Sequence, residues 1–454
     1  MSSTAGSLRG LRFGRRRRTK PKSGSKAKAR PKAPARSLEY SLLLTATMCL
    51  LAFGVVMVFS ASSSASLLGA TGDGAYYLKR TLMFGAFGLL ALHVLARYGL
   101  GAVRTLTPLF LIGAVFLLLA TKVIGAEVNG AQRWIVLGPV QIQASEIAKV
   151  SLMLYGAHIL AERPQMTRDL RSLRPFLLVA GAIIALIVVE PDLGTGMVTA
   201  FSVTALLIAA GVQIRHLAML AGAIGFIVFI AVLMEPYRMA RLTSFINPSA
   251  DASGAGFQGM QASIALGSGG LFGTGIGESV QKAFYLPEAH TDMIAAVIGE
   301  ELGLLGITIL CGLYMMFGYA GFRTAQRAKD RYGRLLAAAL TAMIMVQASI
   351  NLFAVLGLAP LTGVTLPFVS YGNSSLIVTL AAVGLLLNIA NGGTAAAGAS
   401  GSAAGRGSSG FRLLDGGGAG GSARSGGRRA TSSHRSRRHS GARSARAGSR
   451  RRAR

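Results

Sequence analysis

Long apolar runs alternate with short polar segments along most of this chain. Runs of about 20 residues match a helix that crosses ~30 Å of hydrocarbon. We count ten of them, at 41–62, 81–98, 106–125, 146–161, 175–190, 193–211, 216–235, 293–321, 335–358 and 368–390. The pattern predicts an all-α polytopic membrane protein with about ten transmembrane helices.

Basic residues in two connections indicate the orientation. The fourth-to-fifth connection carries Arg163, Arg168, Arg171 and Arg174, and the eighth-to-ninth carries Arg323, Arg327, Lys329, Arg331 and Arg334. The positive-inside rule places both in the cytoplasm. Because an even number of spans returns the chain to its starting side, we expect both termini to be cytoplasmic. The long loop 236–292, between helices seven and eight, is then extracytoplasmic, and its Gly, Gln, Ser and apolar residues predict packing at the membrane interface.

Composition agrees with a membrane protein. The chain has 454 residues, of which 52% are hydrophobic and 14% charged, and its mean hydropathy is +0.51, which excludes a water-soluble enzyme. Cys49 and Cys311 lie in apolar runs far apart in sequence and suggest neither a disulfide nor a metal site.

Most of the net charge of +30 lies in the two tails. Residues 1–36 contain 13 basic and no acidic side chains, and residues 391–454 contain 14 Arg and one Asp. Sequences of this kind cannot bury enough apolar surface to fold. We therefore predict disordered basic cytoplasmic tails at 1–38 and 391–454 around a membrane core at 39–390. The tails are expected to attract anionic membrane lipid rather than specific nucleic acid.

The segment NGAQRWIVLGPVQIQASEIAK, between the third and fourth runs, places basic side chains on the expected outer face. Arg133 and Lys149 could together hold an anionic group such as a pyrophosphate. Trp134, the only Trp, belongs either to this site or to the aromatic belt at the membrane boundary. Ser145 is a candidate helix cap, and Glu146 could pair with Lys149 at i, i+3 in a purely structural role.

Two further outer segments contain polar groups. In EPDLGTG, Asp192 is expected to cap the sixth run. In EPYRMARLTSFINPSAD, Arg238 and Arg241 are three residues apart on one face of an amphipathic helix. They act either as anchors at the membrane surface or as phosphate ligands.

Ionisable residues also gather where the eighth run begins, in AFYLPEAHTDMIAAVIGEELGLLG. Asp292 could accept a proton from a sugar hydroxyl, alongside Glu288 and His290. A helix N-terminus would lower the pKa of Asp292, whereas burial would raise it. The structural alternatives are a helix cap for Asp292 and a buried pair between His290 and Glu288. Deeper in the run, Glu300 and Glu301 either bond to neighbouring helices or face a polar cavity, and the functional alternative is a proton or ion path.

The segment GLAPLTGVTLPFVSYGNSSLIVTL contains prolines and glycines that predict irregular backbone before the tenth run. The hydroxyls of Ser370 and Ser374 could bond a glycan or only satisfy the backbone of the loop itself. The residues alone leave both possibilities open.

Taken together, these segments resemble the SEDS family (shape, elongation, division and sporulation), polytopic glycosyltransferases that polymerise the peptidoglycan precursor lipid II. The resemblance covers about 40–390, with four motifs in family order. FYLPEAHTD followed by IGEELG resembles the division branch, because the elongation branch would have Arg where Ala289 stands. Two positions depart from the family pattern: Ala144 stands where Pro usually precedes Ser-Glu, and Asn373 where Gly usually follows Tyr-Gly.

The resemblance implies an inverting polymerase that uses lipid II as donor and acceptor and releases undecaprenyl pyrophosphate. It assigns Asp292 as the catalytic base and makes Arg133 and Lys149 essential, and we add Arg238 and Arg241 as candidates to compensate the leaving group. No metal ligands are predicted, although a divalent cation could assist.

The resemblance also implies partners and a location. These are a class B penicillin-binding protein with transpeptidase activity, other divisome proteins, and the bacterial cytoplasmic membrane at the division septum. The alternatives are a lipid II flippase that uses Glu300 and Glu301 as a polar path, and a division scaffold that acts through its basic tails.

Overall fold

The computed structural model describes residues 37–68, 72–128, 131–138, 140–234, 236–247, 254, 256–283 and 285–393. The chain divides into two units, Met1–Arg406 and Gly407–Arg454, and every described residue lies in the first. The predicted disordered tails therefore lie almost wholly outside the described residues.

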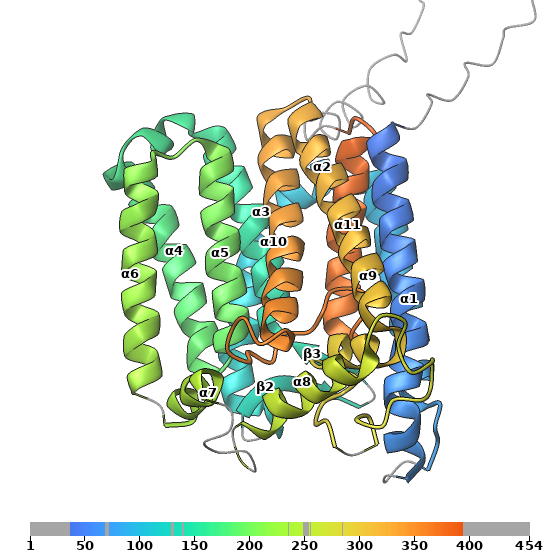
Figure 1. Ribbon diagram of the computed structural model, residues 1–454. Coiled ribbons are helices and arrows are strands. Elements are labelled where there is room, and N and C mark those ends of the chain that lie inside the picture. Colours follow the sequence, from blue (N-terminus) through green and yellow to red (C-terminus); the bar gives the residue numbers. More distant parts are fainter. Residues whose placement is uncertain are drawn as a thin grey trace, which may run out of the picture. The chain divides into compact units, whose positions relative to one another are not determined.

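Helices dominate the described part, which confirms the predicted fold class (Figure 1). They are α1 (Leu38–Leu68), α2 (Tyr76–Ile124), α3 (Ala144–Glu162), α4 (Leu170–Val189), α5 (Leu193–Ala210), α6 (Ile214–Leu233), α7 (Pro236–Ile246), α8 (Phe257–Gly269), α9 (Ile294–Arg327), α10 (Arg331–Val355) and α11 (Asn373–Ala390), with a 3₁₀ turn, η1 (Pro164–Arg168). The long loop between the seventh and eighth predicted runs thus contains two helices, α7 and α8.

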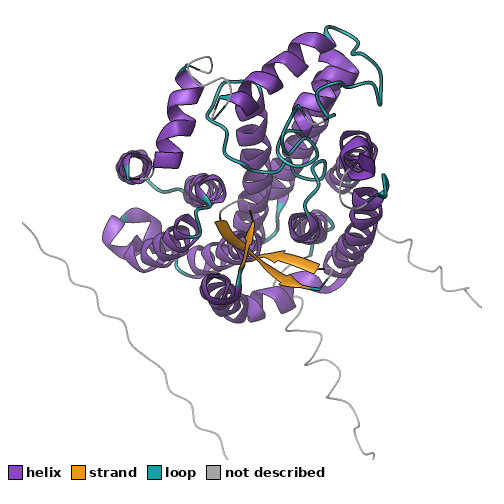
Figure 2. Cartoon of the chain, turned by 90° about the horizontal axis from the view of Figure 1, so that it is seen from below, coloured by secondary structure: helices purple, strands orange, loops and turns teal. Residues whose placement is uncertain are grey.

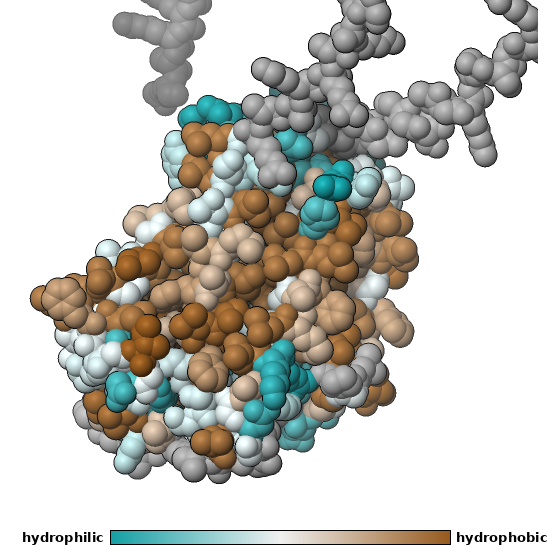
Figure 3. All heavy atoms as spheres, turned by 90° about the vertical axis from the view of Figure 1, so that its right-hand side faces the viewer, coloured by the Kyte–Doolittle hydropathy of each residue, from teal (hydrophilic) through white to brown (hydrophobic). Residues whose placement is uncertain are grey.

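Within the described residues, seven helices are long and apolar enough to cross a membrane: α1, α2, α4, α5, α9, α10 and α11. Helices α3 and α6 coincide with the predicted runs 146–161 and 216–235. Large apolar side chains such as Val56 and Phe59 on α1 point outward, and Figure 3 shows a broad apolar zone across one face with more hydrophilic residues below it. Such an outer surface suits hydrocarbon rather than water. The count of ten spans stays a prediction.

Helix α2 contains both of the predicted runs 81–98 and 106–125, and its two halves cross the bundle in opposite directions. Tyr77 near its start contacts Tyr371, just before α11, whereas Asn388 near the end of α11 donates to the carbonyls of Leu95 and Ala96. The helix then returns, and Lys122 near its end donates to Val189 at the end of α4. The Asn388 amide thus ties the end of α11 to the middle part of α2.

Both ends of the described core lie together. Ser37 donates to the carbonyl of Ala390, and Arg327 at the end of α9 pairs with Glu39 at the start of α1. We call this the terminal end. The opposite end, which we call the loop end, contains the described residues of 126–143, 236–293 and 356–372.

A small antiparallel sheet at the loop end was not predicted; the segment was expected to be a loop. The order is β1 (Ala126–Val128), β2 (Ala131–Leu137), β3 (Val140–Gln143), and Ile135 pairs with Ile142. Figure 2 shows the strands lying among the ends of the helices. Val140 and Ile142 alternate with Gln141 and Gln143, a period of two that indicates a strand, but the run is only four residues long.

Helix α9 is broken at Gly303, which has φ 63° and ψ −160°. Residues before α9 replace the lost helical bonds: Leu304 N–H donates to the carbonyl of Gly270, and Thr274 N–H donates to that of Glu300. A Cβ at position 303 would come within 2.5 Å of the Gly273 nitrogen, so both conformation and space require glycine. The break joins the segment after α8 to the first third of α9.

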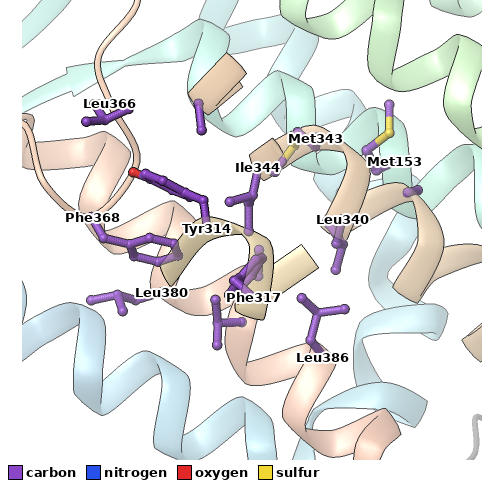
Figure 4. Packing of buried hydrophobic residues seen from close by; sticks show 14 of the residues in the cluster. Met153, Tyr314, Phe317, Leu340, Met343, Ile344, Leu366, Phe368, Leu380 and Leu386 are labelled. Atoms are coloured by element: carbon purple, nitrogen blue, oxygen red, sulfur yellow. The ribbon is translucent and has the colours of Figure 1, made fainter. Parts of the chain in front are cut away.

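The segment 356–372 has irregular backbone, as predicted, and the apolar core supports it. Phe317 on α9 and Phe368 have ring centroids 5.7 Å apart, and Leu380 of α11 is buried in the same cluster (Figure 4). Tyr314 donates its hydroxyl to the carbonyl of Pro367. These contacts fix the loop that lies beside the site described next.

Candidate active site

An apolar cavity of about 680 Å³ opens at the loop end. Residues of α5, α6, α7, α10 and the segment 359–362 line it, and nearly all are apolar. The exceptions include two arginines, Arg133 of β2 and Arg241 of α7. An apolar wall with two guanidinium groups suits a ligand with a hydrocarbon tail and an anionic head.

Asp292 lies next to this cavity, although it is not one of the residues that line it. A Cβ placed on Gly363, the residue after the lining Thr362, would be 3.9 Å from Oδ2 of Asp292. The position is fixed by Asn351 of α10, whose amide donates to the carbonyls of Asp292 and Val364, both at 2.7 Å. A single side chain thus holds Asp292 against the segment that borders the cavity.

The environment makes Asp292 a stronger base than an ordinary carboxylate. Its side chain is buried, and burial, with the negative charge of Glu288, raises the pKa to about 6. Arg241 and the hydroxyl of Thr291 partly oppose this rise. Asp292 does not cap α9, because the residue at that position is Met293, and so the cap alternative is wrong.

Arg241 lines the cavity and also holds the segment 359–364 that lies beside Asp292, because its Nη1 donates to the carbonyl of Leu361 at 3.0 Å. Arg133 donates from Nη2 to the carbonyl of Pro191. Arg238 lies in α7, but its side chain is outside what the structure describes. The two described arginines reach one cavity from segments far apart in sequence.

Glu288 and His290 flank Asp292 without forming the predicted buried pair, because Glu288 is exposed. The ring centroids of His290 and Tyr77 are 4.2 Å apart. Burial lowers the pKa of His290, whereas the negative charge of Glu288 opposes this change. Its carbonyl accepts from Tyr371 N–H. The backbone of Glu288 has φ 55°, an uncommon conformation for a residue with a side chain.

Lys149 is buried and its ammonium group is already occupied. It pairs with Glu146 at 2.8 Å, as the i, i+3 spacing predicted, and donates to Oε1 of Gln347 at 2.7 Å. Gln347 in turn donates to the carbonyl of Thr365. Lys149 therefore braces the segment beside Asp292, and its contact with a ligand stays a prediction, as does that of the half-buried Trp134 on β2.

The serines and the N-terminal turn of α3 have structural partners. Ser370 accepts from Leu366 N–H, and Ser374 accepts from Gln143 N–H. Ser145 does not cap α3, because the cap position is Gln143, and its hydroxyl donates to Asp192 instead. The other predicted cap is confirmed, since Asp192 accepts from Thr195 N–H at the start of α5.

Glu300 and Glu301 bond to the loop before Asp292. Glu301 pairs with Lys282 at 2.7 Å and accepts from Ser60 of α1, while Glu300 accepts from Ser279 and from Val280 N–H. The carboxylates therefore hold this loop on the broken part of α9. The predicted bond to a neighbouring helix is found for Glu301 and Ser60 of α1, whereas the other partners lie in this loop.

Sequence reasoning missed several polar residues of the site. Gln347 and Asn351 are four apart in the largely apolar α10 and so share one face, a signal for a polar role in a membrane span. Among the described residues, His, Cys, Asp and Glu form no group of three or more that could hold a metal ion.

Comparison with known proteins places this chain in a family. Residues 40–394 match the family described as "Cell cycle protein", which joins FtsW, RodA and SpoVE, and the chain belongs to it. A "Probable peptidoglycan glycosyltransferase FtsW" from Trichlorobacter lovleyi is 39% identical over 366 residues, covering 79% of this chain and 95% of the relative. "Stage V sporulation protein E" of Bacillus subtilis is 39% identical over 353 residues, covering 77% and 96%.

Comparison with solved structures supports the same family. A chain from "Structural coordination of polymerization and crosslinking by a peptidoglycan synthase complex" has a TM-score of 0.65 at 29% identity and covers 79% of this chain and 98% of that one. Rod shape determining protein RodA from Thermus thermophilus has a TM-score of 0.58, also at 29% identity, with the same coverage. This chain is a multi-pass membrane protein of the SEDS family.

Proposed function

We propose that this protein is a peptidoglycan glycosyltransferase that polymerises lipid II into glycan strands at the outer face of the cytoplasmic membrane during cell division. The family and its relatives named FtsW support this proposal. The observation that carries it is the position of Asp292, a buried carboxyl with a pKa of about 6, beside an apolar cavity with two arginines.

In the proposed reaction, the 4-hydroxyl oxygen of one lipid-linked disaccharide forms a bond to the anomeric carbon of the growing chain. The bond from that carbon to the pyrophosphate breaks, with inversion, and undecaprenyl pyrophosphate leaves. Asp292 takes the proton that the hydroxyl loses. With a pKa of about 6, most Asp292 side chains are ionised at neutral pH, yet each is more basic than a solvent-exposed aspartate.

The cavity supplies what the lipid-linked leaving group requires. Its apolar wall accommodates part of the isoprenoid chain, and Arg133 and Arg241 compensate the charge that develops on the pyrophosphate. The other proposed contributors to substrate binding are Arg238, Lys149, Trp134, Glu288, His290, Ser370 and Ser374. A divalent cation, if bound, would add to the charge compensation.

The related structure whose title describes a peptidoglycan synthase complex supports a partner. We infer that this chain works with a class B penicillin-binding protein, together with other divisome proteins, at the septum. The two basic tails would add contacts with anionic lipid.

The test is polymerisation of purified lipid II by the wild type and by Asp292→Ala, each reconstituted with its cognate penicillin-binding protein carrying an inactivated transpeptidase site. We expect polymer from the wild type and none from a normally folded Asp292→Ala. An equally active variant would exclude Asp292 as the base. The absence of polymer from the wild type beside an active partner preparation would favour flipping or scaffolding.

A further inference from the structure

Glu190 is a buried carboxyl for which the proposed reaction has no use. It directly follows α4, the residue is 1% exposed, and within the described part of the chain neither carboxyl oxygen has a hydrogen-bond partner. Buried polar groups are nearly always bonded, so such an exception requires a reason.

Two basic side chains bind the backbone on either side of Glu190. Lys122 of α2 donates to the carbonyl of Val189, and Arg133 of β2 donates to the carbonyl of Pro191. Their charges therefore lie at the C-terminal end of α4, where cations are favoured. Arg133 also lines the cavity, and its Nε is buried without a partner among the described residues.

Burial raises the pKa of Glu190 to about 8, and the negative charge of Asp192 adds to this rise, whereas Lys122 and Arg133 oppose it. These three are the charged groups that act on Glu190 from α2, β2 and its own connection. Asp192 already accepts from Gln143, Ser145 and Thr195 N–H. At neutral pH the Glu190 carboxyl is therefore mostly protonated, and it leaves the charge of Arg133 uncompensated.

We propose that Glu190 tunes the anion site at Arg133: its neutral form leaves the guanidinium available to a diphosphate in the cavity, and its ionisation weakens that binding. This inference rests on the proposed function, because it assumes that the cavity takes a polyprenyl diphosphate. Glu190 is a positioning residue that acts through Arg133.

Linkage gives this proposal a specific signature. A bound diphosphate repels the ionised form of Glu190, so binding near pH 8 draws a proton onto the protein, and proton loss at higher pH weakens binding by the same free energy. A residue that only fills space would give neither effect.

The experiment is calorimetric titration of the purified full-length protein in detergent with farnesyl diphosphate at pH 7, 8 and 9, in buffers of different ionisation enthalpy. The variants are Glu190→Gln, which is a permanently neutral isostere, and Glu278→Gln, which removes an exposed carboxylate of the 270–283 loop. Ionisation of the diphosphate itself affects all three proteins alike.

Relative to Glu190→Gln, we expect the wild type to lose about five- to ten-fold in affinity between pH 7 and pH 9. We also expect proton uptake at pH 8 in the wild type and in Glu278→Gln but not in Glu190→Gln. Parallel affinity profiles with equal proton uptake in all three proteins would overturn the proposal.

Two further measurements keep the test decisive. Should Glu190→Gln fail to fold, Glu190→Met offers a neutral side chain of similar length with the same expected profile. Polymerisation of lipid II is assayed separately. If the protein makes polymer but its affinity for farnesyl diphosphate has no Glu190-dependent pH profile, this inference alone is refuted. If the pH profile is found but no polymer forms, the proposed function is refuted and Glu190 is retained as a regulator of anion binding.

Discussion

Two sets of buried carboxylates lie in this core, and they differ in how their oxygens are occupied. Glu300 and Glu301 accept hydrogen bonds from Ser279, Ser60, Lys282 and backbone N–H groups. Glu190 has no such partner among the described residues, and Asp292 accepts from the hydroxyl of its neighbour Thr291. The comparison indicates that fully bonded carboxylates hold the loop in place, whereas the sparsely bonded ones are available for chemistry.

The largest effect is expected at Asp292. Asp292→Asn removes the base while keeping the shape of the side chain, so the polymerisation rate should fall about 10²–10⁴-fold. The unfolding temperature in detergent should stay close to that of the wild type, because the variant removes a charge that burial disfavours. A variant that is both inactive and strongly destabilised would place Asp292 with the structural set.

At Glu301 we expect a large loss of stability, in contrast to the loss of activity expected at Asp292. Glu301→Gln leaves Lys282 buried without its counter-ion, which typically costs about 3–5 kcal/mol of unfolding free energy. The measurement is denaturant-induced unfolding in mixed micelles. The double variant Glu301→Gln with Lys282→Met should recover much of the loss, and a single variant as stable as the wild type would contradict the structural role.

A smaller effect is expected at the cavity. Arg241→Gln should raise the KM for lipid II about ten-fold, because one charge-assisted contact with the pyrophosphate is lost. It should also move the acid limb of the pH–rate profile to higher pH, since Arg241 lowers the pKa of Asp292. Arg163→Gln removes an exposed arginine at the terminal end and serves as the matched control; an equal effect from this control would exclude a local role for Arg241.

The smallest effect is expected at Glu288. Its negative charge raises the pKa of Asp292, so Glu288→Gln should move the acid limb to lower pH by a few tenths of a unit. The pH–rate profile of Glu278→Gln should match that of the wild type. A shift to higher pH in Glu288→Gln would show that the two carboxyls do not interact as described.

The sequence predicted the helices well because hydrocarbon imposes length and apolarity on each crossing. The run 193–211, for example, corresponds to α5 (Leu193–Ala210). The runs 81–98 and 106–125 were predicted as separate helices, and the sequence did not show that helical structure continues between them in α2. The last predicted helix begins five residues later than predicted, because the residues from Phe368 to Gly372 belong to the irregular segment that packs on the core.

Site residues were predictable where a local spacing carries the interaction. Glu146 and Lys149 are three apart, and their pair follows from helix geometry. The partners of Glu301 lie 241 residues before it and 19 before it, so no local pattern contains them. The lack of a hydrogen-bond partner for the Glu190 carboxyl, among the described residues, likewise depends on how the surrounding segments pack and cannot be read from the sequence.

The most direct test of the account is the pH dependence of lipid II polymerisation by the reconstituted wild type. If Asp292 is the base, the rate should be constant near pH 7, bend at about pH 6, and fall ten-fold for each unit below that. The residual activity of Asp292→Asn should lack this limb. A wild-type rate that stays constant down to pH 4.5, or the same limb in the variant, would contradict the central claim.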